Sequence, residues 1–264
     1  MLAELTARSE LSNLSDPRLF REQAYVGGKW TAAQGGEVIS IINPATGAKL
    51  GVVPALGAAE TEAAIQAAAK AFPAWRKLLP QERAARLRRW YELMVEARAD
   101  LALLMTLEQG KPLAEAEGEI AYAASFIEWY AEEAKRVNVE GITPHLPNRQ
   151  MSVRREPIGV VAAVTPWNFP SAMITRKAAA ALAAGCPIVV RPASETPYSA
   201  LALAELAERA GIPAGVFSVV TGPAQPIVDA LLASPIVRAL SFTGSTEVGR
   251  KLLEGGAPDR KSVV

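Results

Sequence analysis

The sequence has few of the residues that build disulfides, metal sites or histidine-dependent catalysis. Among its 264 residues there is one cysteine, Cys186, and one histidine, His145. One cysteine excludes a disulfide within the chain and favours a reducing compartment, so we expect a cytoplasmic protein. The histidine lies in the Pro-rich stretch 143–147, which argues against a Ser-His-Asp triad, and one histidine with one cysteine argues against a site built from such ligands. We therefore expect no metal.

Strong charge of one sign and long apolar runs are missing too. Lys and Arg together number 28 and Asp and Glu 27, giving a formal net charge of +1. This balance argues against nucleic acid or an anionic membrane as the main partner. The longest apolar run, residues 178–190, contains Gly185 and Pro187 and is shorter than the ~18 residues of a membrane span. We expect neither a nucleic-acid partner nor a membrane partner.

Local patterns divide the first part of the chain. Residues 1–20 look like a leader with helical character, and residues 25–30 predict a short hairpin with a Gly-Gly turn. Residues 38–42 predict a strand, and apolar spacing predicts helices from residue 58 to about 136. In residues 137–157, two alternating segments flank a Pro-rich loop, which predicts a protruding two-stranded arm.

From residue 158 onward the sequence alternates between apolar strands and helices. This order predicts βαβ units and a mostly parallel, doubly wound α/β sheet. The strands are almost wholly apolar, as expected where both faces of a parallel sheet are covered. The predicted strands are 158–164, 188–191, 216–220 and 238–241, and the predicted helices are 169–184, 196–210, 224–233 and 245–254.

Polar residues gather where two of these strands end, in residues 165–170 and 191–194. In open α/β sheets this edge is where ligands bind. Asn168 lies in the first turn, where its side-chain amide can donate a hydrogen bond to a developing oxyanion. The same residue also suits an Asx-type turn before Phe169 and Pro170, and the residues alone leave both interpretations open.

A third turn, within residues 241–249, follows the last strand and opens a helix. Gly244 permits a tight turn and either Ser245 or Thr246 can cap the helix, whose free N–H groups suit a phosphate. An ordinary capped helix explains the same residues. The segment lacks the G-x-G-x-x-G fingerprint, and it misses the P-loop pattern because Arg250 and Lys251 stand where Lys and Ser or Thr are required. A P-loop NTPase is therefore a poorly supported alternative.

Basic residues occur in two helical settings. Arginines between residues 83 and 89 predict a solvated face. Arg176 and Lys177 lie in a helix that is otherwise apolar, and a cation on a buried side needs an anion. That anion is either a structural carboxylate or a substrate carboxylate. Cys186, in an apolar run, is typical of a buried thiol that packs as a small hydrophobe.

These segments together resemble the aldehyde dehydrogenase superfamily and, within it, the succinate-semialdehyde dehydrogenase branch. The resemblance covers nearly the whole chain from about Leu19. It implies a Rossmann-like nicotinamide-cofactor domain without the G-x-G-x-x-G turn, with residues 21–136 as its N-terminal part, 137–157 as an oligomerisation arm and 158–264 as its core. The blocks that carry the resemblance are NPATGAKLGVVPALGAAET, MTLEQGKPLAEAEGEIAYAASFIEWYAEEAKR, PIGVVAAVTPWNFPSAMITRKAAAALAAGC, TPYSALALAELAERAGIPAGVFSVVTG and LSFTGSTEVGRKL.

The resemblance assigns roles to residues in these turns. Asn168 matches the family's oxyanion donor, and Arg176 matches the branch's arginine that grips the distal carboxylate of succinic semialdehyde. Gly244 and Ser245 match the turn next to the cofactor pyrophosphate. The implied cofactor-binding residues are Thr165, Pro166, Trp167, Asn168, Arg191, Pro192, Ala193, Ser194, Phe242, Gly244, Ser245 and Val248.

One of these segments departs from the family pattern. Residues 191–194 read Arg-Pro-Ala-Ser, where the family usually has Lys-Pro-Ala followed by Ser or Glu. The family's Lys holds the adenosine ribose, and Arg is not equivalent to Lys at a close contact. Ser194, where NAD-preferring members often carry Glu, leaves room for a ribose 2′-phosphate, which Arg191 would also favour. The resemblance therefore implies NADP or NAD as the cofactor and favours NADP.

The family's nucleophilic Cys and its general-base Glu, in a Leu-Glu-Leu-Gly-Gly context, do not appear before Val264. Cys186 is not that nucleophile by its position in the motif. We therefore expect a truncated chain without the catalytic domain, inactive alone. The complete enzyme is expected to be a homo-oligomer, a dimer or tetramer, that oxidises succinate semialdehyde or glutarate semialdehyde to the dicarboxylate. The alternative is a non-catalytic nucleotide-binding or assembly module that uses the arm.

Overall fold

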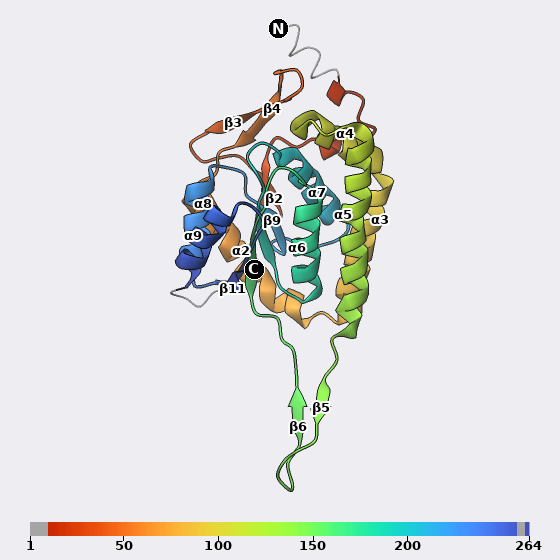
Figure 1. The fold of residues 1–264 in the computed structure, drawn as a ribbon, viewed down its shortest axis with the longest axis vertical. Helices are drawn as coiled ribbons and strands as arrows, with labels where there is room; N and C mark the ends of the chain where they lie inside the picture. Colours follow the sequence, from red (N-terminus) through yellow and green to blue (C-terminus); the bar gives the residue numbers. More distant parts are fainter. Residues whose placement is uncertain (1–9, 258–261, 264) are drawn as a thin grey trace.

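A seven-stranded sheet forms the centre of the protein in a computed structural model that describes residues 10–257 and 262–263 (Figure 1). Five strands run parallel and two antiparallel strands extend the edge beside β9. This confirms the predicted doubly wound α/β fold. In spatial order the strands are β11 (Ser262–Val263), β10 (Val237–Phe242), β7 (Val160–Val164), β8 (Ile188–Arg191), β9 (Phe217–Val219), β1 (Ala24–Val26) and β2 (Lys29–Thr31).

Helices cover both faces of the sheet and give it two hydrophobic cores. Alternate residues of one strand enter opposite cores, because successive side chains of a strand point to opposite faces. In β8, Val189 joins the core under α2 and α8, whereas Ile188 and Val190 join the core under α6 and α7. The helices packed on the sheet are α2 (Ala58–Lys77), α6 (Ala172–Ala183), α7 (Pro197–Arg209), α8 (Ala224–Ala233) and α9 (Thr246–Gly256).

A further helical layer packs outside α6 and α7, as Figure 1 shows in yellow to lime green. It consists of α3 (Pro80–Glu96), α4 (Arg98–Gln109), α5 (Leu113–Glu133) and the 3-10 turn η2 (Ala134–Arg136). Proline begins α3, and Gly110, with φ 85°, ends α4 in the left-handed conformation that glycine favours. The helical stretch predicted from residue 58 to about 136 is therefore confirmed as four helices and a 3-10 turn.

The arginine-rich part of α3 is less exposed than its charge pattern predicts. Arg83 is buried, and its guanidinium donates to the carbonyl oxygens of Ala183 at 3.1 Å and Leu78 at 2.6 Å. The prediction of a solvated face is wrong at this residue, because two carbonyl groups at helix ends use the guanidinium as a donor. Arg88 and Arg89 do pair with partly exposed glutamates, as a solvated face requires.

The N-terminal part adds two hairpins and a short 3-10 turn. The turn between β1 and β2 has Gly27 at φ 60° and Gly28 at φ 82°, which confirms the predicted Gly-Gly hairpin. Strand β3 (Val38–Ile42) has the predicted bounds and pairs with β4 (Lys49–Pro54) in a sheet of its own. Of the predicted leader, residues 1–9 lie outside the described residues, and the rest includes the 3-10 turn η1 (Pro17–Leu19).

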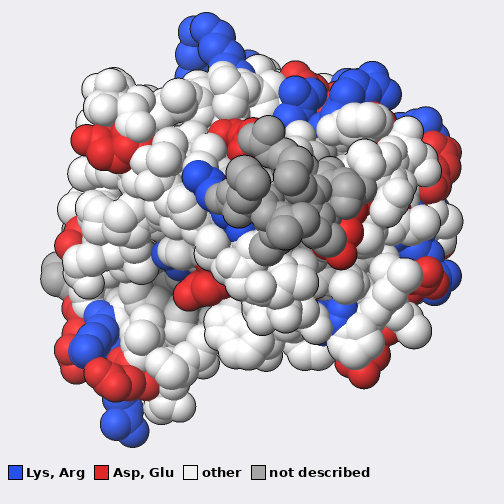
Figure 2. Space-filling view, turned by 90° about the horizontal axis from the view of Figure 1, so that it is seen from above, with Lys and Arg blue, Asp and Glu red and all other residues white. Residues whose placement is uncertain are grey.

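A two-stranded arm projects from the body, drawn in green in Figure 1. Its strands β5 (Glu140–Ile142) and β6 (Met151–Val153) pair antiparallel, and all their residues are exposed. The arm confirms the shape predicted for residues 137–157. Figure 2 shows the opposite end of the molecule, where acidic and basic side chains are interspersed. No described helix is both long and apolar enough to cross a bilayer.

Candidate functional site

Three adjacent strands end at the same level of the sheet. Val164 in β7 pairs with Arg191 in β8 on one side and with Phe242 in β10 on the other. The turns that follow are tied together, because Thr165 N donates to Arg191 O at 3.2 Å and Thr243 N to Val164 O at 3.2 Å. The structure therefore brings the three predicted turns side by side at one edge, which in such sheets is the ligand-binding edge.

The turn after β7 holds its central side chains out of the core. Trp167, Asn168 and Phe169 are exposed, and Ser171 behind them is buried. The Asn168 side-chain amide makes no hydrogen bond to any described residue, so the structure shows no Asx-type turn there. Asn168 thus presents an amide that is available to a ligand, as an oxyanion donor must be.

Two side chains that sequence reasoning missed anchor this turn. Lys111 Nζ donates to Asn168 O at 2.9 Å and lies 4.1 Å from the centre of the Phe169 ring. Glu119 Oε1 accepts the N–H groups of Ser171 and Ala172 at the start of α6. The sequence offered only the helix break at residues 110–112 as a signal, and the contact between α5 and the turn has no local pattern.

Strand β8 ends in a buried cation, Arg191, just before the turn that follows it. Arg191 is 8% exposed, and its Nη2 donates to Ser194 Oγ at 2.7 Å and to Gly222 O at 3.1 Å. Burial lowers the pKa of Arg191, and the nearby Glu195 opposes this. The Nε of Arg191 and the hydroxyl of Thr165 are buried without a partner among the described residues.

The turn after β10 has the form of a helix cap. Ser245 Oγ accepts a hydrogen bond from Val248 N at 3.4 Å, the N-cap arrangement of α9. A Cβ atom on Gly244 would lie 2.3 Å from the Phe242 ring, so only glycine fits without rearrangement. The capped helix is confirmed, and the binding of a phosphate at its N-terminus stays a prediction.

Arg176 and Lys177 lie on α6 beside a cavity of about 500 Å³. Arg176 Nη2 donates to Tyr122 Oη at 3.2 Å, and its guanidinium lies 4.7 Å from the Phe126 ring centre. No acidic residue in the described ranges pairs with Arg176, so the structural carboxylate that the sequence left open is not found there. Lys177 Nζ donates to Thr243 Oγ1 at 2.7 Å, and burial, followed by repulsion from Arg176, lowers its pKa to about 8.

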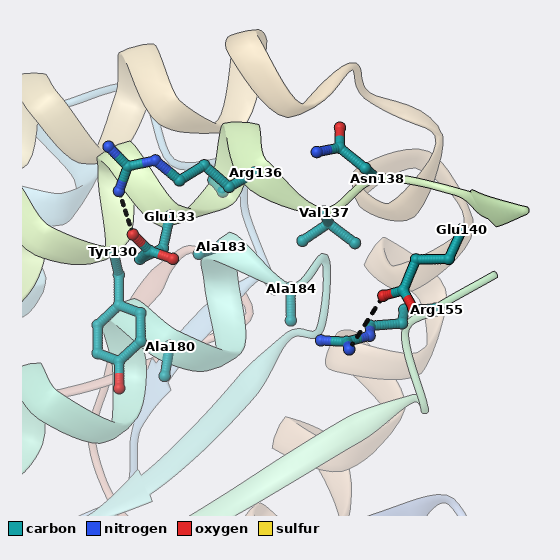
Figure 3. A pocket seen from close by; sticks show the side chains of 11 residues that line it. Tyr130, Glu133, Arg136, Val137, Asn138, Glu140, Arg155, Ala180, Ala183 and Ala184 are labelled. Carbon is teal, nitrogen blue, oxygen red and sulfur yellow. Dashed lines mark hydrogen bonds and ion pairs between the residues drawn. The ribbon is translucent and has the colours of Figure 1, made fainter. Parts of the chain in front are cut away.

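Other cavities separate into those at the edge and those away from it. Trp167 and Ser194 line one of about 570 Å³ together with β3. Figure 3 shows another, of about 390 Å³, at the base of the arm, where Arg136 pairs with Glu133 and Arg155 with Glu140. The charges drawn in Figure 3 pair with one another, so this cavity identifies no ligand. Cys186 is buried beside the Arg176 cavity, as its position in the core predicts.

Residues 30–264 match the sequence profile of the aldehyde dehydrogenase family. The chain belongs to this family, and the resemblance described from its sequence is confirmed. The family match also agrees with the geometry, since the three turns meet at the cofactor-type edge of a doubly wound sheet.

Several curated relatives carry semialdehyde names. The chain is 64% identical over 250 residues to the glutarate-semialdehyde dehydrogenase of Pseudomonas aeruginosa, covering 95% of this chain and 52% of that protein. It is 62% identical over 250 residues to the NADP(+) succinate-semialdehyde dehydrogenase GabD of Escherichia coli, with the same coverage. The chain thus spans about half the length of the curated relatives it matches.

Solved structures agree with the fold. A crystal structure of an E. coli NADP-dependent enzyme superposes with a TM-score of 0.94 at 61% identity, covering 95% of this chain and 52% of the other. A succinate-semialdehyde dehydrogenase from Burkholderia pseudomallei also gives 0.94, at 57% identity, covering 96% and 52%. These likenesses confirm the aldehyde dehydrogenase type of α/β fold.

Proposed function

We propose that this chain is the cofactor-binding part of an NAD(P)-dependent dehydrogenase that oxidises succinate semialdehyde or glutarate semialdehyde to the dicarboxylate. The observation that carries the proposal is the meeting of three turns at one sheet edge. One of these turns carries the exposed amide of Asn168. The helix that follows this turn carries Arg176, which forms no ion pair with an acidic side chain among the described residues. The names of the relatives at 62% and 64% identity support the same substrates.

Each residue has a chemical task in this proposal. Arg176 binds the distal carboxylate of the substrate, because a guanidinium without an acidic neighbour favours an anion. The Asn168 amide then donates to the aldehyde oxygen as negative charge develops on it. Thr165, Arg191 and the Gly244 turn would hold the cofactor at the edge of the sheet, where its nicotinamide ring would supply the hydride acceptor.

We favour NADP over NAD on the chemistry of the second turn. Arg191 Nε has no partner among the described residues, and the small Ser194 leaves space where a longer acidic side chain would repel a 2′-phosphate. The E. coli relative named for NADP(+) supports this choice. A strong preference of the protein for NAD would overturn it.

The chain spans about half the length of its curated relatives, and in this proposal the nucleophile and the general base belong to the other part of the enzyme. Cys186 is 3% exposed, and a thiol in an apolar core is not a nucleophile. We therefore expect the isolated chain to bind cofactor without reducing it. A chain with one cysteine forms no internal disulfide, which favours a reducing compartment, and we propose the cytoplasm.

Three measurements test the proposal. Titration calorimetry of the 264-residue chain should show saturable binding of NADP, and the chain should not reduce NADP in the presence of succinate semialdehyde. In a complete enzyme that contains this chain, Asn168→Ala should lower kcat by about 100- to 1000-fold, the usual effect of losing one oxyanion donor. Absence of cofactor binding, turnover by the isolated chain, or full activity of Asn168→Ala would each contradict it.

The arm favours assembly into homo-oligomers. Its apolar side chains Val139, Ile142 and Val153 are exposed on a two-stranded ribbon, which is marginally stable alone in water. We propose that these side chains are buried against another copy in a dimer or tetramer. In sedimentation velocity the complete protein should be oligomeric, and Ile142→Lys with Val153→Lys should dissociate it. If the doubly substituted protein keeps the wild-type mass, the arm has no such role, and the assembly-module alternative fails with it.

A further inference from the structure

The turn that carries Asn168 is held by the side chains of Lys111, in the loop before α5, and Glu119, in α5. Lys111 Nζ contacts Glu119 Oε2 at 2.5 Å and Asn168 O at 2.9 Å. Glu119 Oε1 accepts from Ser171 N at 3.0 Å and Ala172 N at 3.2 Å. These bonds hold the middle of the turn, at the Asn168 carbonyl, and its C-terminal end, at the first N–H groups of α6.

The pair is buried, which makes each member depend on the other. The Glu119 side chain is 1% exposed and that of Lys111 is 10% exposed. Removing one partner of a buried ion pair leaves an uncompensated charge in a low dielectric. Each oxygen of Glu119 has a partner, and the Lys111 ammonium is shared among a carboxylate, a carbonyl and the Phe169 ring. The arrangement is complete only when both residues are present.

The contact fixes the backbone of Asn168 and leaves its side chain free. Lys111 binds the carbonyl oxygen, so the orientation of the following peptide plane is set from the loop between α4 and α5. The side-chain amide of Asn168 is exposed and makes no hydrogen bond to the described residues. A donor to an oxyanion works only at a preorganised position, so the anchor supplies what the turn alone lacks.

We propose that Lys111 and Glu119 are positioning residues for Asn168, an inference that rests on the proposed function. Neither side chain touches the substrate. Their task is to keep the turn 165–171 in the geometry in which the amide meets the developing charge. A misplacement of about 1 Å in such a group costs roughly 100-fold in rate, so loss of the anchor should appear in kcat.

A first experiment measures the turn itself and needs no activity. Hydrogen exchange of the 264-residue chain is compared for wild type, Lys111→Met, Lys111→Arg and Glu119→Gln, with Glu108→Gln as the matched control. Glu108 accepts the N–H groups of Tyr198 and Ser199 at the start of α7 in the same way. Lys111→Met and Glu119→Gln should speed exchange at Ser171 and Ala172 by about tenfold or more, with Tyr198 and Ser199 unchanged. Glu108→Gln should speed exchange at Tyr198 and Ser199 and leave Ser171 and Ala172 unchanged.

A second experiment uses the complete enzyme and separates positioning from binding. Lys111→Met should lower kcat by about 100-fold while KM for succinate semialdehyde changes little, and Lys111→Arg should recover much of the loss. If wild type is inactive toward semialdehydes, the proposed function fails and the exchange data still decide whether the pair holds the turn. If wild type is active and Lys111→Met keeps its kcat, or if exchange at Ser171 and Ala172 is unchanged, the positioning role is overturned.

Discussion

The carboxylates of Glu108 and Glu119 cap two neighbouring helices of the sheet in the same manner. Glu108, at the end of α4, accepts the N–H groups of Tyr198 and Ser199 at 2.7 Å each, where α7 begins. Glu119, in α5, accepts two N–H groups where α6 begins. A carboxylate at a helix N-terminus satisfies free donors and complements the helix dipole. Glu108 and Glu119 therefore fix the starts of α6 and α7, two of the three helices that follow the candidate site turns.

Glu119 is paired with the ammonium of Lys111, whereas Glu108 has no cationic partner among the described residues. This difference predicts that the stability contributed by Glu108 depends on pH. Burial raises the pKa of Glu108 to about 7, against the lowering by its hydrogen bonds to Ser199 and Tyr198. The folded state therefore binds more protons than the unfolded state between pH 4.5 and 7. The stability from this group is present below pH 4.5 and is lost as pH rises through 7. Wild type should lose up to about 3 kcal/mol more than Glu108→Gln between pH 4.5 and 8 in urea unfolding.

Glu60 provides a control of opposite sign. It accepts the N–H groups of Gly57 and Gln34 at the start of α2, and these bonds lower its pKa. Its stability contribution is present above the ordinary carboxyl pKa and is lost as pH falls. Glu60→Gln should therefore reduce stability at neutral pH and have little effect in acid. Parallel pH profiles for Glu108→Gln and wild type would contradict the assignment at Glu108.

A pair of glycines with positive φ separates backbone strain from close packing. Gly28 has φ 82°, and a Cβ there would lie 2.4 Å from Ala214 Cβ. Gly36 has φ 76° with nothing within 4 Å of the same atom. Gly36→Ala should cost about 1 kcal/mol from the left-handed conformation alone. Gly28→Ala should cost about 1–3 kcal/mol more because the hairpin must shift. Equal unfolding free energies for both variants would show that Ala214 moves away freely.

The sequence predicted those parts of the fold that depend on local patterns. The predicted bounds of β3, β8 and α8 coincide with the observed ones, because each is a short periodic run between turn residues. Strand β4 was not predicted, since residues 49–54 contain a glycine and a proline and lack alternation. The burial of Arg83 was missed because its acceptor on Ala183 is 100 residues away along the chain.

The candidate site divides in the same way. The sequence predicted that Asn168, Arg191 and Gly244 share one edge because each lies at or just after the end of an apolar strand, and parallel strands bring such ends together. Lys111 and Glu119 were not found, because their contacts with the turn span 57 and 52 residues. A basic residue beside a helix-breaking proline carries no signal of its partner. Such anchors depend on how α5 packs against α6, which no local pattern encodes.

The choice between NADP and NAD is testable at Ser194 with the isolated chain. Its hydroxyl accepts from Arg191 Nη2 at 2.7 Å, next to the position proposed for the 2′-phosphate. Ser194→Glu places a negative charge there, so the Kd for NADP should rise by about tenfold or more, with little change for NAD. Ser194→Ala is the control, because it removes the hydroxyl without adding charge. An equal loss for both cofactors by calorimetry would place the phosphate elsewhere.

The role of Arg176 is testable with two aldehydes that differ in charge. Arg176 faces Tyr122 and Phe126 rather than an acid, so its charge is available to a substrate carboxylate. In a complete enzyme, Arg176→Met should lower kcat/KM for succinate semialdehyde by roughly 30- to 100-fold, the value of a charge-assisted hydrogen bond. Butanal, which lacks the carboxylate, should be affected far less. Arg136→Met serves as the control, because Arg136 pairs with Glu133 on the surface. If both aldehydes lose activity equally, Arg176 stabilises the fold of α6 and does not select the substrate.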